Sequence, residues 1–140
     1  QTFLLEFSLF GSMIFSYLIL LAAFVMFAWG SLGFLEYFFG ITPLVPLQNP
    51  TFPKGTQFVH WLLIFSSGSI YLIGYFTKWK NTPFAMVIIY AMLATLCAVE
   101  TFDFMTNSGR YGSFIRECIA YVGISIYLFR SQRMRSHFGR

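Results

Sequence analysis

Four long apolar runs, separated by short polar segments, dominate this chain of 140 residues. A helix that crosses the hydrocarbon core of a bilayer needs about 20 mostly apolar residues. Runs that reach or approach this length occupy residues 10–32, 57–76, 83–104 and 113–129. The fourth run is the shortest, and it begins with the more polar stretch SFIRECIAY. The pattern predicts four transmembrane helices.

The segments between these runs are typical of connections that lie outside the hydrocarbon. Residues 41–56, ITPLVPLQNPTFPKGT, contain four prolines, and proline at this density is incompatible with a regular helix. The links TKWKNTP and MTNSGRYG are short, and residues 130–140 form a basic tail. We therefore expect one all-α domain over residues 1–140, an integral membrane four-helix bundle with up-down topology and an outer proline-rich loop.

Composition supports this interpretation. Hydrophobic residues make up 57% of the chain and charged residues only 10%, whereas an ordinary soluble domain is about 25% charged. A chain of this size cannot bury so much apolar surface in its own core, so the surplus must face lipid or partner subunits. The net charge of +4 does not indicate nucleic-acid binding, because the tail beside the last run holds the residues expected at anionic lipid headgroups: Arg130, Arg133, Arg135 and Arg140.

The distribution of Lys and Arg predicts the orientation in the membrane. Cytoplasmic connections carry an excess of these residues close to the ends of the spans. The connection between runs two and three, together with the C-terminal tail, carries six, and the opposite side carries Lys54, Arg110 and Arg116. This count predicts that both termini are cytoplasmic.

The stretch AVETFDF places Glu100 and Asp103 at the outer end of the third run. Residues three apart share a helix face, and charges in a membrane usually pair or face the bundle interior. One interpretation is a structural network in which Arg110 and Arg116 neutralise these acids. A second is solvation at the interface. A third is a divalent-cation site, whose mixed ligand set would be Glu100, Asp103, Glu117 and His60.

Two further features leave alternatives open. His60, beside Trp61, suits either an interfacial role or the binding of a haem or pigment metal, although the other histidine lies in the tail on the opposite side. Cys97 and Cys118 lie on neighbouring runs, so they either pair or remain buried thiols. No motif of nucleophilic catalysis, phosphate binding or dinucleotide binding is present, and the sequence requires no cofactor.

The segments AWGSLGFLEYFFGITP, FVHWLLIFSSGSIYLIGYF and IIYAMLATLCAVETF carry a resemblance to small four-helix membrane proteins, the DoxX-like group and related uncharacterised families. The resemblance covers about two thirds of the chain and rests on hydropathy. Since that group includes subunits of membrane quinone-linked oxidoreductases, it implies a place in a membrane complex. It transfers no catalytic residue to this chain.

The sequence thus favours a non-catalytic accessory subunit of a larger respiratory, photosynthetic or oxidoreductase complex. The bulky, aromatic first run fits contact with larger membrane subunits, and the chain has no self-sufficient active site. The alternative is a stand-alone binding or transport protein. Its outer site would hold a divalent cation or a small solute between Glu36, His60, Glu100, Asp103 and Glu117. A third possibility is a pigment- or haem-binding subunit that uses His60.

Overall fold

A computed structural model describes residues 2–42, 46–47 and 52–139, and every regular element among them is a helix. Four helical segments are long and apolar enough to cross a membrane. This confirms the all-α part of the prediction. The elements, in chain order, are α1 (Thr2–Phe39), α2 (Lys54–Thr77), α3 (Thr82–Val99), the π-helical turn η1 (Glu100–Phe104), α4 (Arg110–Arg130) and the short α5 (Gln132–His137).

The first two helices extend beyond the predicted runs. Helix α1 covers 38 residues, because the apolar stretches on both sides of residues 10–32 continue the helix without a proline. Helix α2 begins at Lys54, inside the expected loop 41–56, since Pro53 is the last proline before it and takes an extended conformation with φ −59° and ψ 153°. Pro43 and Pro50 lie outside the described residues.

Glycines bring α1 and α2 into close contact. A Cβ atom on Gly30 would lie 2.7 Å from Cα of Phe65, and one on Gly68 would lie 2.5 Å from the backbone nitrogen of Phe27. A Cβ on Gly33 would meet the ring of Trp61. Small residues allow such approach where helices pack without a hydrophobic driving force between them. The first run, bulky as it is, therefore has a narrow packing stripe of its own.

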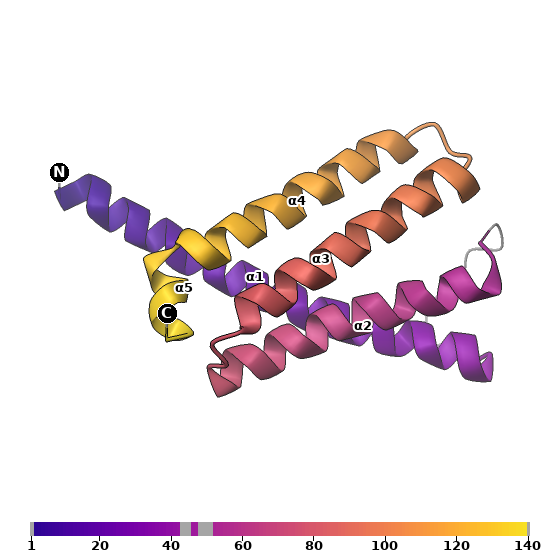
Figure 1. Cartoon of the computed structure of the whole chain (residues 1–140), viewed down its shortest axis with the longest axis horizontal. Coiled ribbons are helices and arrows are strands. Elements are labelled where there is room, and N and C mark those ends of the chain that lie inside the picture. Colours follow the sequence, from indigo (N-terminus) through magenta and orange to yellow (C-terminus); the bar gives the residue numbers. More distant parts are fainter. Residues whose placement is uncertain (1, 43–45, 48–51, 140) are drawn as a thin grey trace.

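The helices pack in chain order, with α2 between α1 and α3, and α4 against α3. Figure 1 shows α1 crossing the other helices obliquely, with its N-terminal part projecting beyond them. Helix α4 is the least buried of the four candidate spans. The bundle is therefore open on the α4 side of α1, which leaves a groove and a cavity between the helices.

Helix α5 folds the C-terminal tail back onto the end of α2. Met134 and Phe138 are each only 1% exposed. The ring of His137 stacks on Tyr75 with centroids 4.1 Å apart, and its Nε2 lies 2.7 Å from the Tyr75 carbonyl oxygen. Part of the tail is thus packed into the protein. The arginines expected at lipid headgroups are exposed at Arg130, Arg133 and Arg135, whereas Arg140 lies outside the described residues.

Candidate functional site

Helix α3 ends in the π-helical turn η1, whose first residue is Glu100, the central acid of the candidate site. The backbone N–H of Met105 donates to the Glu100 carbonyl 2.8 Å away, which closes a five-residue turn. Such turns are rare and are often found at functional sites. Within this turn Glu100 is 7% exposed and Thr101 is 1% exposed, whereas Asp103 is exposed. The two acids predicted to share a role therefore differ in their environment.

Glu100 is paired with His60, from the second turn of α2. The distance from His60 Nδ1 to Glu100 Oε1 is 3.1 Å, with the side chains 29% and 9% exposed respectively. An ionised carboxylate only accepts hydrogen bonds, so Nδ1–H is the donor and the Nε2 lone pair of a neutral ring remains an acceptor. The edge of the His60 ring meets Trp61, with centroids 4.7 Å apart. This pair links α2 to the end of α3.

The arginines expected to neutralise Glu100 have other partners. Arg110 donates to two carbonyls of the preceding turn, at 2.8 and 3.3 Å. Arg116 donates to the hydroxyl of Ser113, one turn earlier on its own helix, at 3.2 Å. In the part of the chain that the structure describes, neither forms an ion pair with a carboxylate, and His60 occupies the place that the predicted network assigned to arginine. Local acceptors can be reached at a smaller entropic cost than a carboxylate on another helix.

The remaining acids of the predicted cluster are spread apart. Glu36 accepts a hydrogen bond from the backbone N–H of Leu47 at 2.7 Å, which ties the end of α1 to the following loop. Glu117 comes from α4, where it is solvent-exposed and Tyr121 Oη donates to it at 3.5 Å. Among the described residues, no three His, Cys, Asp or Glu side chains form a group that could hold a metal ion. The metal hypothesis therefore has His60 and Glu100 together, but no third ligand beside them.

A cavity of about 360 Å³ surrounds the His60–Glu100 pair, and all four long helices contribute to its wall. Two carboxylates, Glu100 and Glu117, reach it from different helices. Much of the remaining wall is aromatic or contains sulfur. These further lining residues include Trp29, Phe52, Phe114 and Tyr121, together with Met26, Cys97 and Met105. The cavity thus combines acidic acceptors with flat, polarisable walls.

Both cysteines are free thiols, so the possible disulfide is not formed. Cys97 lines the cavity, with its Sγ 3.9 Å from the hydroxyl of Thr101. Cys118 lines a different pocket, between α3 and α4. The spacing along the sequence does not reveal that the two thiols line different pockets.

Some residues of the cavity were not singled out from the sequence, although a signal for them exists. Thr101 follows Cys97 by four positions, and Tyr121 follows Glu117 by four. Residues separated by four positions share a helix face. Cys97 therefore indicates that Thr101 lies on the cavity side, and Glu117 indicates the same for Tyr121. Trp29 carries no such signal, because it lies in an aromatic run whose buried side depends on the glycine contacts of α1.

Comparison of the chain with models of protein families, with curated proteins and with solved structures gives no match. The DoxX-like resemblance remains a prediction, and the functional argument rests on the site itself.

Proposed function

We propose that this chain is a multi-pass integral membrane protein, with up-down topology and both termini cytoplasmic, that binds a small organic cation in the cavity around Glu100. The observation that carries this proposal is the His60–Glu100 pair, placed in a cavity walled by all four long helices. Ionisable groups within membrane segments are costly, and they commonly mark functional pathways and sites.

The balance of charge in the cavity favours a cation. Glu100, Glu117 and Arg110 all line it, so two carboxylates stand against one guanidinium, whose N–H groups already donate to backbone carbonyls and to the Tyr111 hydroxyl. In the neutral ring, His60 donates through Nδ1–H to Glu100, and Nε2 is then an acceptor. A ligand with a positive charge or several N–H donors complements this arrangement, whereas an anion would face two carboxylates.

The walls of the cavity favour an organic cation over a metal ion. Trp29, Phe114 and Tyr121 present aromatic groups around the acids. A cation held over an aromatic face gains about 0.5–2 kcal/mol, with the larger value where water is excluded. The metal alternative needs more oxygen or nitrogen ligands than the described residues supply around Glu100. A small amine or quaternary ammonium ion would contact both the carboxylates and the aromatic side chains.

The test uses the full chain in nanodiscs, with choline, ethylammonium and tetramethylammonium as probes and 3,3-dimethyl-1-butanol as the uncharged isostere of choline. Calorimetric titration should detect at least one of the cations and not the alcohol. Glu100→Gln should abolish that binding. Asp103→Asn is the matched control, because Asp103 lies in the same turn but does not line the cavity.

Three results would contradict the proposal. Equal binding of choline and its uncharged isostere would show that the charge is irrelevant. Absence of binding for every cation at millimolar concentration, with a folded wild-type protein, would exclude a solute site of this kind. An equal loss in the Asp103→Asn variant would indicate a general effect of surface charge and would also contradict the assignment to Glu100.

The length of α1 favours a second function, that of an accessory subunit which packs against a larger membrane partner. At 1.5 Å per residue its 38 residues extend about 57 Å, against a hydrocarbon core of about 30 Å. Even at about 40°, the upper end of usual tilts, about 14 Å would remain outside the core. Its N-terminal side chains are exposed and apolar, with Phe3 74% and Phe7 68% exposed.

Gentle extraction from the native membrane, followed by native gel separation and mass spectrometry, tests this second function. A stoichiometric set of larger subunits is expected to migrate with the wild type. A variant with Phe3→Ser, Leu4→Ser and Phe7→Ser should lose them while it remains folded. Migration of the wild type alone, or as a homo-oligomer, would exclude the accessory role.

A further inference from the structure

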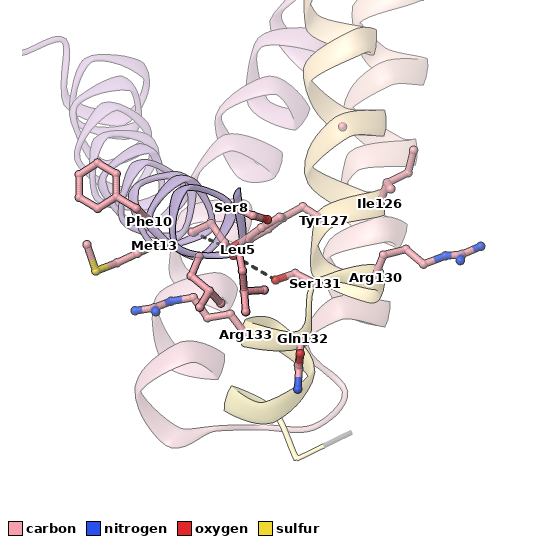
Figure 2. Close-up of a pocket in the computed structure, with 13 residues that line it drawn as sticks. Leu5, Ser8, Phe10, Met13, Ile126, Tyr127, Arg130, Ser131, Gln132 and Arg133 are labelled. Atoms are coloured by element: carbon pink, nitrogen blue, oxygen red, sulfur yellow. Dashed lines mark hydrogen bonds between the residues drawn. The ribbon is translucent and has the colours of Figure 1, made fainter. Parts of the chain in front are cut away.

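A groove of about 850 Å³ lies between the N-terminal half of α1 and the junction of α4 with α5, at the end of the molecule opposite the Glu100 cavity. Figure 2 shows Leu5 of α1 close to Tyr127 of α4, whereas Phe10 and Ile126 point outward on opposite sides. Neither α2 nor α3 contributes to its wall. The groove is therefore formed by α1 and the α4–α5 junction alone.

Hydrogen-bonded hydroxyls connect the two sides of this groove. Tyr127 Oη lies 2.8 Å from Ser12 Oγ and donates to the Ser12 carbonyl at 2.7 Å. Ser131 Oγ lies 3.4 Å from the same Ser12 hydroxyl. The ring of Phe15 packs edge-on against Tyr127, with centroids 4.6 Å apart. These contacts join α1 to α4 beside the apolar space of the groove.

Two arginines flank the groove on different sides. Figure 2 shows Arg133 reaching toward α1 and Arg130 extending from α4 in the opposite direction. The Arg133 guanidinium lies 5.8 Å from the centroid of the Tyr17 ring. No carboxylate lines the groove, and within the described residues neither arginine forms an ion pair. Glu6 is the acid nearest along α1, and it does not belong to the wall.

We propose that this groove binds an anionic phospholipid of the surrounding membrane, with an acyl chain between α1 and α4 and the phosphate at Arg133. Arg130, on the other flank, adds positive charge without contacting the same phosphate. The charges are complementary, because the headgroup brings the phosphate that the Arg133 guanidinium lacks. The largely apolar wall matches the shape and polarity of an acyl chain. Lys78 and Lys80 follow the end of α2, onto which α5 folds, so the whole basic end of the protein faces the same headgroup layer.

A substitution of Gly123 tests the contribution of the groove without changing the surface charge. Gly123 lines the groove, and a Cβ atom there would meet nothing within 4 Å. Gly123→Leu should therefore extend a side chain into the acyl-chain space from a position with room for its Cβ, and it removes no charge. Ala120→Leu is its matched control, since Ala120 is exposed on the same helix but does not line the groove. Arg135→Gln is the control for charge, because Arg135 is exposed on α5 outside the wall.

Native mass spectrometry of the full chain, with phosphatidylglycerol or phosphatidylcholine added to the detergent micelles, tests the proposal. The wild type should retain one phosphatidylglycerol at least tenfold better than phosphatidylcholine, and soluble glycerol phosphate should not bind. The double variant Arg130→Gln, Arg133→Gln and the variant Gly123→Leu should each reduce retention at least tenfold. Ala120→Leu and Arg135→Gln should retain the lipid.

Three outcomes would overturn it. Equal retention of both lipids would show that the phosphate charge does not contribute. Binding of glycerol phosphate as tight as that of the lipid would assign the site to a free anion. A loss in Arg135→Gln as large as in the double variant would show general electrostatic attraction, with no defined site in the groove.

Discussion

The partner of Glu100 can be identified by a double-mutant cycle in the folded protein. His60→Phe keeps an aromatic ring beside Trp61 and removes the Nδ1 donor, and Glu100→Met keeps the length of the side chain without its charge. The structure predicts a coupling between positions 60 and 100, because their side chains meet at 3.1 Å. It predicts none between Glu100 and Arg116, whose partner is a serine on its own helix.

The expected coupling follows from burial. A hydrogen bond to a charged group contributes about 1.5–3 kcal/mol. The Glu100 side chain is 9% exposed and the His60 side chain 29%, so water partly replaces His60 when it is removed and the lower end applies, about 1.5 kcal/mol. His60→Phe alone should be the costlier single change, because it leaves the buried carboxylate without its donor. The double variant should be about as stable as, or more stable than, His60→Phe.

Reversible unfolding in mixed micelles of mild detergent and sodium dodecyl sulfate gives the four free energies of each cycle. The control cycle combines Glu100→Met with Arg116→Met, for which additivity within about 0.5 kcal/mol is expected. A coupling for His60 within that same margin would refute the reasoning. So would an equal coupling for Arg116, since it would restore the arginine network that the sequence suggested.

Other predictions concern helix packing, the tail and the thiols. Gly68→Ala should destabilise the protein by about 1–3 kcal/mol, because its Cβ would lie 2.5 Å from the Phe27 nitrogen and 2.6 Å from the Ala23 carbonyl oxygen. Thermal unfolding measures this loss, and the control variant Gly123→Ala should not show it. His137→Ala should lower the free energy of unfolding by about 1 kcal/mol, because it removes the hydrogen bond to the Tyr75 carbonyl. It should also speed tryptic cleavage in the tail. Unchanged cleavage would contradict the packing of α5 against α2. In unreduced, denatured protein a maleimide should label both cysteines, and a protein without labels would indicate a disulfide.

The candidate site was only partly predictable from the sequence. The pattern placed Glu100 and His60 at one level of the bundle, because helical rise is constant and both lie near the outer ends of their runs. It did not identify them as partners over the arginines, since a pairing depends on the rotation of each helix about its axis. The π-helical turn changes that rotation after Val99, which separates buried Glu100 from exposed Asp103.

The packing of the C-terminal tail was also only partly predictable from the sequence. Its arginines indicate a headgroup-facing segment, and three of them are exposed. Met134 and Phe138 have too little periodic context, in a helix of six residues, to reveal that they fill the end of the core. Their burial depends on the open end of α2, where Lys78 adopts a left-handed conformation and ends the helix.

The sequence by itself determined the helices and the apolar surface of this protein. Long apolar runs can satisfy their backbone hydrogen bonds only within themselves when water is absent, so their local structure needs no tertiary information. The tertiary structure decided the pairing of His60 with Glu100, the crossing of α1 over Gly68 and the groove that Arg130 and Arg133 flank. These features join residues far apart in the chain. Their contacts exist only once the helices have set their mutual rotation and separation.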